Sequence, residues 1–249
     1  MIFRQLFEPL SSTYTYLIGC AVTRAAVLID PVVNTLERDL AELNRLGLTL
    51  AYTLDTHIHA DHITSALHLK QQVGSRIAAP AINRLACADL GIEDEKPFTV
   101  GQLQLMPLFT PGHTDDHFSY RLGDRVFTGD ALLIEGCGRT DFQNGSADAL
   151  YQSITGRLFV LPDETLVYPA HDYQQRRVTT IAQEKDRNPR IGRGKSPEEF
   201  RAIMAGLDLP YPKFIDYAVP GNRRCGVCPE GLPEQLQQHC EQMAFSPQG

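Results

Sequence analysis

The sequence has no excess of basic residues, no long hydrophobic run and no dense set of cysteines. Its 23 Lys and Arg residues stand against 30 Asp and Glu residues, and the net charge of −7 excludes a broad nucleic-acid-binding surface. The longest apolar runs, such as AAVLI at 25–29, are far shorter than a membrane span. Residues 1–12 lack the apolar stretch of a signal peptide. We therefore expect a cytoplasmic protein that binds neither nucleic acid nor a membrane.

The cysteines are too sparse for a small disulfide scaffold. The six residues are spread over the whole chain, and without an export signal we expect them to be reduced thiols. Cys225-x-x-Cys228, followed by His239 and Cys240, has the composition of a small zinc site. A structural zinc, a redox role and a chance spacing all stay open for this motif.

The first third of the chain alternates between strand-like and helix-like patterns. Apolar, β-prone runs at 14–19 and 24–30 predict a hairpin, and leucines at helical spacing predict a helix over 34–47. A buried strand over 48–56, an amphipathic helix over 59–74 and a short strand over 75–80 are expected next. This alternation is typical of an α/β architecture.

The rest of the chain has more strands and ends in an irregular tail. The patterns predict strands over 98–110, 117–130 and 165–171, a helix over 146–161, a helix beginning at Ser196-Pro197, and an irregular tail over 218–249. The sequence has no internal repeat and no low-complexity linker. We expect one domain over 1–249, with a core over about 1–175 and a C-terminal appendage over about 176–249.

The most informative segment is THIHADH at residues 56–62, which follows a predicted buried strand. Three histidines and one aspartate lie within six residues: His57, His59, Asp61 and His62. Such clustering is hard to explain by packing, because buried polar groups need partners and exposed ones need no clustering. Imidazole and carboxylate groups at the end of a strand form a ligand set for a divalent metal.

Further candidate ligands follow three other β-prone runs. They are His113 in TPGHTDDH, Asp130 in FTGD and His171 in YPAHDY. Four separate loops thus offer His or Asp at the ends of strands. This distribution indicates that strand ends converge on a single metal site.

In this order, the motifs THIHADH, TPGHT, TGD and AHDY resemble those of the metallo-β-lactamase superfamily over residues 10–175. The resemblance implies an αβ/βα four-layer sandwich with two central β-sheets and metals at one edge. Segments 129–154, 188–192 and 215–226 are similar to those of persulfide dioxygenases, also called sulfur dioxygenases. This closer resemblance extends to about Cys225.

The resemblance implies a metal and its ligands. Persulfide dioxygenases hold one Fe(II) through the residues that match His57, His113 and Asp130, a two-histidine, one-carboxylate set that leaves open positions for oxygen chemistry. His59, Asp61, His62 and His171 would then orient these ligands and tune the iron. Superfamily hydrolases instead use all seven residues for two zinc ions, with Asp130 as the bridge. The sequence retains every one of these ligands, so both metal contents stay open.

The resemblance also implies a substrate, glutathione persulfide, whose carboxylates need cationic partners. In a chain of net charge −7, these must be local arginines, and Arg139 and Arg190 are the candidates. An exposed surface charge is the alternative for Arg190. Tyr173 is expected to donate a hydrogen bond near the reacting sulfur and to belong to the catalytic residues. Glu135 is expected to weaken the affinity for an anionic substrate, and Cys137 to be a small buried hydrophobic residue.

The implied function is oxidation of glutathione persulfide by O₂ to sulfite and glutathione, as in hydrogen sulfide catabolism. Two alternatives remain: a two-zinc glutathione thioester hydrolase of the glyoxalase II type, and a metal-containing binding or redox-relay protein without catalysis. The RTDFQ segment and the short C-terminal region speak against the first, and the complete ligand set speaks against the second. A rhodanese-like sulfurtransferase partner and a homodimer are further expectations.

Overall fold

The computed structural model of the protein describes residues 1–234, 236 and 237. Two compact units make up the chain. The first contains residues 1–91, 100–102 and the described residues from Tyr211 on, and the second contains residues 92–99 and 103–210. The expectation of one domain with an appendage from about residue 176 stays a prediction. No helix within the described residues is long and apolar enough to cross a membrane.

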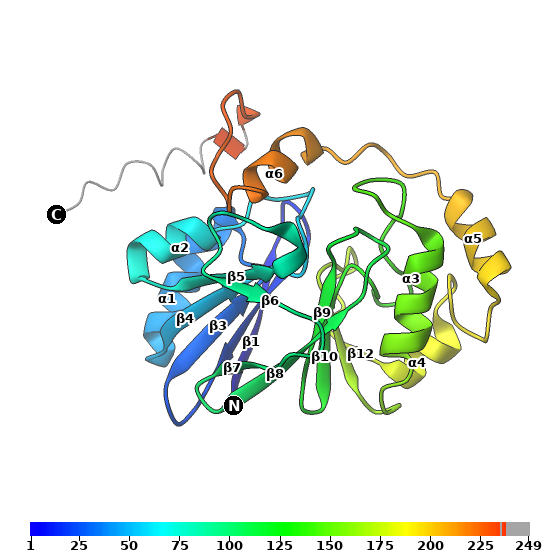
Figure 1. Ribbon diagram of the computed structural model, residues 1–249, viewed down its shortest axis with the longest axis horizontal. Coiled ribbons are helices and arrows are strands. Elements are labelled where there is room, and N and C mark those ends of the chain that lie inside the picture. Colours follow the sequence, from blue (N-terminus) through cyan, green and yellow to red (C-terminus); the bar gives the residue numbers. More distant parts are fainter. Residues whose placement is uncertain (235, 238–249) are drawn as a thin grey trace. The chain divides into compact units, whose positions relative to one another are not determined.

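The first sheet has six strands in the order in which they occur along the chain (Figure 1). Its β1–β2 and β2–β3 pairs are antiparallel, and its β3–β4 and β4–β5 pairs are parallel. The strands are β1 (Ile2–Glu8), β2 (Thr13–Gly19), β3 (Ala25–Ile29), β4 (Thr49–Leu54), β5 (Arg76–Pro80) and β6 (Leu90–Ile92). Because β3 and β4 are parallel, the loops that follow them leave from the same edge of the sheet.

Helices α1 (Leu36–Leu46) and α2 (Ala66–Val73) pack on this sheet. Leu36 and Leu43 of α1 and Leu69 of α2 are buried in one cluster with Leu17 and Leu28 of the sheet. The leucines of α1 therefore face the sheet, as their helical spacing in the sequence predicts. Both helices end at a glycine with a left-handed backbone, a conformation that glycine adopts at little cost.

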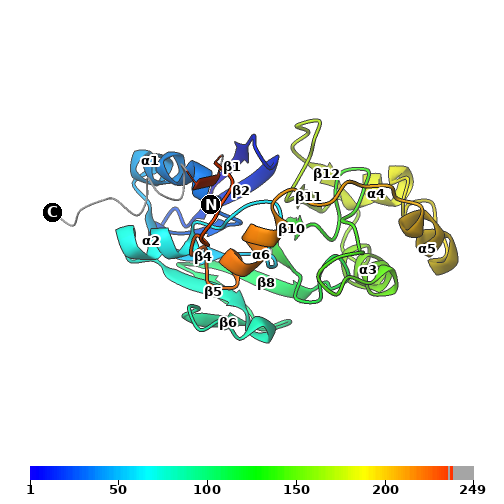
Figure 2. The ribbon, with the colours of Figure 1, turned by 90° about the horizontal axis from the view of Figure 1, so that it is seen from above.

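The second sheet also has six strands, in the order β12-β11-β10-β9-β8-β7. They are β7 (Phe98–Val100), β8 (Leu103–Phe109), β9 (Phe118–Leu122), β10 (Arg125–Gly129), β11 (Leu166–Pro169) and β12 (Thr179–Thr180). Helices α3 (Ala147–Ser153), α4 (Ile181–Arg187) and α5 (Pro197–Ala205) lie together beside it (Figure 2). Leu150, Ile181 and Phe200 of these helices share a buried cluster with Val126 and Val167 of the strands.

Two expectations about local structure are wrong. The helix predicted over 59–74 begins only at Ala66, because the backbone of residues 57–65 bonds to other segments described below. The tail predicted to be irregular from residue 218 contains most of helix α6 (Ile215–Asn222). A helix pattern with an internal Pro220 and a Gly221 at its end is weak, and tertiary contacts decide the outcome there.

The expectation of reduced cysteines is also wrong for Cys87, Cys225 and Cys228, which are disulfide-bonded. Cys87 and Cys225 form a disulfide across 138 positions of sequence, with a Cα–Cα distance of 6.2 Å. Cys225 is therefore neither a zinc ligand nor half of a Cys225–Cys228 redox pair. His239 and Cys240, the other members of that hypothesis, lie outside the described residues. Cys20 and Cys137 are buried free thiols.

Helix α1 contains a buried carboxyl whose protonation affects stability. Asp39 is fully buried and accepts hydrogen bonds from Arg38 at 2.9 and 2.7 Å. Burial outweighs the attraction of Arg38 and raises the pKa of Asp39 to about 6 from its usual 3.8. The native state thus binds this proton more tightly than the unfolded chain does, so stability contributed by the protonated carboxyl is lost as the pH rises from about 4 to about 6.

Asp39→Asn is expected to remove this pH dependence. The shift corresponds to roughly 3 kcal/mol, so the free energy of unfolding of the wild type, relative to the variant, should fall by about that amount between pH 4 and pH 7.5. Urea unfolding at both pH values measures the difference. An equal change with pH in both proteins would contradict it.

Candidate metal centre

Asp30, directly after β3, fixes the start of the histidine-rich loop that follows β4. Its Oδ1 accepts a hydrogen bond from the Thr56 backbone N–H at 2.7 Å, and its Oδ2 accepts one from the Thr56 hydroxyl at 3.1 Å. Both residues are buried. Asp30 holds a left-handed backbone with a φ of 50°, a conformation that aspartate adopts more often than most residues other than glycine. The shared edge of the parallel strands β3 and β4 makes this contact possible.

The side chain of His57 is oriented by Thr56. Nδ1 of His57 lies 3.0 Å from the Thr56 hydroxyl oxygen. Since the single hydroxyl proton of Thr56 is donated to Asp30, its oxygen accepts the Nδ1 proton of His57. This tautomer leaves a lone pair on Nε2, the arrangement that a metal-ligating histidine requires.

His59 is the most deeply buried histidine of the loop, and one of its nitrogens is bonded to Asp30. Its Nε2 lies 3.0 Å from Asp30 Oδ1, whereas Nδ1 is buried and has no hydrogen-bond partner within the described residues. Burial opposes a charge on this ring, but attraction by Asp30, Asp61 and Asp55 outweighs it and raises the pKa of His59 to about 10. The one-iron and two-zinc alternatives differ in whether this Nδ1 binds metal.

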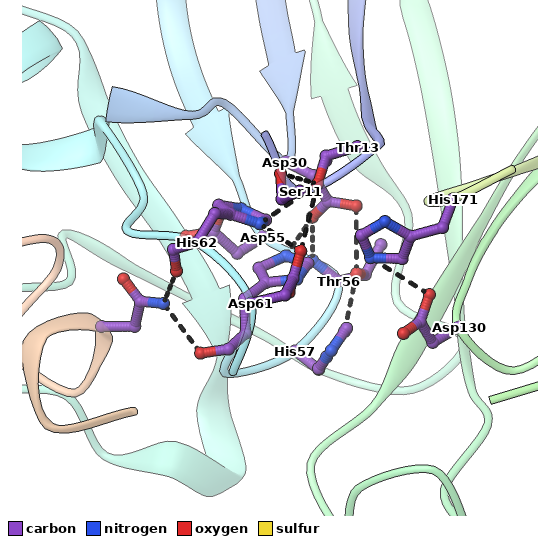
Figure 3. Close-up of polar contacts among 12 residues, drawn as sticks. Ser11, Thr13, Asp30, Asp55, Thr56, His57, Asp61, His62, Asp130 and His171 are labelled. Atoms are coloured by element: carbon purple, nitrogen blue, oxygen red, sulfur yellow. Dashed lines mark hydrogen bonds and ion pairs between the residues drawn. The ribbon is translucent and has the colours of Figure 1, made fainter. Parts of the chain in front are cut away.

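Asp61 and His62 are linked to the turn between β1 and β2 (Figure 3). His62 Nδ1 lies 3.0 Å from Asp61 Oδ2, and the Thr13 hydroxyl donates to the same oxygen at 3.2 Å. Ser11 Oγ lies 2.7 Å from Thr13 Oγ1 and donates to the buried carboxylate of Glu8 at 2.5 Å. Sequence analysis missed these three supporting residues, because only the pairing of the strands brings them to this loop.

In the second unit, His113 and Asp130 have the local geometry of a ligand pair. His113 Nδ1 donates to the Arg139 carbonyl at 2.8 Å, so its Nε2 carries the lone pair. That Nε2 lies 3.3 Å from Asp130 Oδ2, and His171 Nε2 lies 3.6 Å from Asp130 Oδ1. Ligand atoms that share one metal at about 2.1 Å lie roughly 3 Å apart. Asp130 Oδ1 is buried without a hydrogen-bond partner in the described part of the chain, which also fits a metal there.

Two glycines allow the backbone to pass close to this pair. Gly112, with a φ of 132°, precedes His113, and a side chain there would collide with the backbone of Leu150 in α3. At Gly138, a Cβ would lie 2.6 Å from His113 Nδ1 and 2.6 Å from the carbonyl oxygen of Asp130. The loops that carry His113 and Asp130 can therefore touch only with glycine at these positions.

Arg176 ties the loop after β11 to the loop after β10. Its guanidinium donates to Asp172 Oδ1 at 2.8 Å, to Glu135 Oε2 at 2.7 Å and to the Ile134 carbonyl at 2.9 Å. Asp172 is buried and directly follows His171. Glu135, expected to weaken binding of an anion, is thus paired with a cation. The sequence alone gave no signal for Arg176.

The residues predicted to bind substrate differ in how many contacts they make with the rest of the protein. Arg139 donates to both oxygens of Asp141, at 2.6 and 2.7 Å, and to the Pro210 carbonyl at 2.7 Å. Arg190 donates to the carbonyl of Cys137, and burial raises the pKa of the Cys137 thiol to about 11, as expected for an unreactive cysteine. Tyr173 is 78% exposed, and its ring stacks on that of His171 at 6.3 Å between centroids.

Comparison with known proteins identifies the family. The sequence pattern of the Metallo-beta-lactamase superfamily matches residues 9–87 and 88–171. The chain is 48% identical to the human protein "Persulfide dioxygenase ETHE1, mitochondrial", over 91% of this chain and 89% of that one. The crystal structure of ETHE1 from Myxococcus xanthus is 58% identical, has a TM-score of 0.88, and is matched over 91% of this chain and 100% of that one.

The chain belongs to the metallo-β-lactamase superfamily. Within the superfamily it is a persulfide dioxygenase, an oxidoreductase, and the αβ/βα fold class predicted from its motifs is confirmed. A hydroxyacylglutathione hydrolase of Rhodospirillum rubrum is 35% identical over 68% of this chain and 66% of that one. The name of the human relative includes a mitochondrial location, so the cytoplasmic location expected for this persulfide dioxygenase stays a prediction.

Proposed function

We propose that this persulfide dioxygenase oxidises glutathione persulfide. One persulfide, one O₂ and one water give one glutathione and one sulfurous acid, which ionises to sulfite, so the terminal sulfur gains all three oxygens. The observation that carries the proposal is the 48% identity over 91% of the chain to a persulfide dioxygenase, together with the His113–Asp130 pair.

The metal in this proposal is one Fe(II) per chain, held by His57, His113 and Asp130. Both histidines have Nδ1 bonded to an oxygen and a lone pair on Nε2, and Asp130 offers a buried carboxylate oxygen, so the donor chemistry fits. Fe(II) supplies the redox chemistry that a reaction of O₂ with a closed-shell sulfur compound requires. Zinc has no accessible redox change and would not supply it.

The protein's own residues orient the ligands and the substrate. His59, Asp61, His62 and His171 would stay outside the ligand set and fix the loops through Asp30, Thr13 and Asp130. Arg139 and Arg190 would meet the carboxylates of the glutathione part, and Tyr173 would donate a hydrogen bond near the reacting sulfur. Asp141 and Pro210 accept from three of the five N–H groups of Arg139, so a substrate carboxylate would meet the other two or exchange with these partners.

A two-zinc glutathione thioester hydrolase is the second candidate function. Two observations favour it. His59, Asp61, His62 and His171, the further ligands that two zinc ions need, are all present. The chain is also similar to a hydroxyacylglutathione hydrolase. A sulfurtransferase partner and a homodimer remain proposals that accompany the main function.

Metal analysis and oxygen uptake separate the two functions. Protein purified without air is expected to contain about one iron per chain and to consume about one O₂ per glutathione persulfide, with sulfite as product. Replacement of iron by zinc should abolish this uptake, and thioester hydrolysis should be negligible in both forms. About two zincs per chain, with thioester cleavage in the absence of O₂, would contradict the proposal, because hydroxide generation needs only Lewis acidity.

A further inference from the structure

The histidine-rich loop needs hydrogen-bond donors that regular structure does not supply. Residues 57–65 form neither a helix nor a strand, and His57, His59 and His62 are buried. Buried carbonyl groups in such a segment must be satisfied from elsewhere. One side of the loop is bonded to residues 31–33, through the Val33 N–H to the Ile63 carbonyl and the Ser65 N–H to the Pro31 carbonyl.

Asn222, the last residue of α6, supplies the bonds on the other side. Its Nδ2 donates to the His59 carbonyl at 2.9 Å and to the His62 carbonyl at 2.8 Å. Its Oδ1 accepts the Thr64 backbone N–H at 2.9 Å. Asn222 is 3% exposed, so water cannot readily replace these bonds. One side chain therefore ties together three points of the segment that carries the candidate ligands.

The chain that follows Asn222 is held against the same region. The Cys225 carbonyl accepts the Leu67 N–H at 3.0 Å, and a side chain at Gly226 would collide with the carbonyl oxygen of Thr64. Cys225 is in turn bonded to Cys87. The hydrogen bonds of Asn222 are thus one of several contacts in the first unit that hold this part of the chain against the loop, so its position does not depend on one flexible side chain.

We propose that Asn222 is a positioning residue for the metal site. By holding the carbonyls of His59 and His62, it sets the path of the backbone from which His57, His59, Asp61 and His62 project, and so the direction of their ligand atoms. Asn222 touches neither metal nor substrate in this role. The inference rests on the proposed function for the statement that this loop binds metal.

Asn222→Asp is the variant that tests this role most directly. It keeps the size of the side chain and the acceptor for the Thr64 N–H, but a carboxylate oxygen replaces the amide that donates to the two carbonyls. We expect its affinity for Co(II), measured by competition with a chelator, to fall about 10- to 100-fold, as for other groups that orient metal ligands. The visible absorption bands of bound Co(II), which report ligand geometry, should also change.

Leu43→Ala is the matched control. Leu43 is buried in the cluster of α1 and the first sheet, which includes no residue of the loop. It should lower the urea midpoint of the protein and leave the Co(II) affinity and spectrum of the folded protein unchanged. Asn222→Ser keeps a hydroxyl donor in a smaller volume and replaces Asn222→Asp in the experiment if that variant does not fold. Its Co(II) affinity should lie between that of the wild type and that expected for Asn222→Asp.

Wild-type Co(II) affinity and an unchanged spectrum in a folded Asn222 variant would overturn the proposal. Equal losses of affinity in the Asn222 variants and in Leu43→Ala would also overturn it, since the effect would then be one of stability alone. The failure of the proposed function is seen separately, as a wild-type protein that takes up no O₂ with glutathione persulfide, and it leaves the Co(II) comparison intact.

Discussion

Replacing His113 or Asp130 with alanine is expected to remove more than about nine-tenths of the bound iron and nearly all O₂ uptake with glutathione persulfide. Each residue supplies one of only three protein ligands in the proposed site, and the 3.3 Å contact between them would be lost in either variant. Iron per chain after anaerobic purification, and the O₂ electrode, measure the two effects. Circular dichroism checks that the variants remain folded.

His59→Ala is the informative comparison for this prediction. The proposal places His59 outside the ligand set, bonded to Asp30 through Nε2, so this variant should retain substantial iron. The buried Nδ1 of His59 would be a ligand in the two-zinc alternative. If His59→Ala loses metal as completely as His113→Ala does, the site has a different ligand set from the one proposed.

Loss of the Cys87–Cys225 disulfide is expected to have the largest effect on stability. It closes a loop of 138 positions, and removal of so long a cross-link frees enough entropy in the unfolded chain to cost up to about 5 kcal/mol. For a chain of this size, that corresponds to a decrease in Tm of roughly 10–20 °C. Thermal unfolding of Cys87→Ser, and of the wild type with and without a dithiol reductant, measures it.

The reductant provides the control for the disulfide prediction. It also reduces the disulfide of Cys228, so it should bring the wild type and Cys87→Ser to about the same Tm, with the larger decrease in the wild type. Alkylation of the unreduced, unfolded protein should leave Cys87 and Cys225 unlabelled, whereas the free thiols of Cys20 and Cys137 should react. Labelling of Cys87 before reduction would contradict the assigned pair.

Sequence patterns predicted those elements whose cause is local. The β2–β3 hairpin and helix α1 follow from alternation and leucine spacing, and the structure confirms both. The candidate ligands were found because residue type and position after a strand are visible in the sequence. The resemblance of the motifs to a family added the fold class, which no periodicity could have given.

Features that depend on distant contacts could not be predicted. The helix expected from residue 59 begins at Ala66 because Asn222 and the segment around Val33 take up the backbone groups before it. The pairing of Cys87 with Cys225 does not follow from spacing, since several pairings are compatible with six cysteines. Arg176 was missed because its partners come from another loop.

The position of Asn222 in the chain has a consequence for how the protein is made. Asn222 lies 160 residues after His62, whose carbonyl it holds. At synthesis rates of about 5–20 residues per second, the ribosome needs roughly 8–32 s to add those residues. During that interval the histidine-rich loop has already been synthesised, but the amide that holds it has not. If Asn222 positions the metal site as proposed, metal can load onto a completed loop only after nearly the whole described chain has been synthesised.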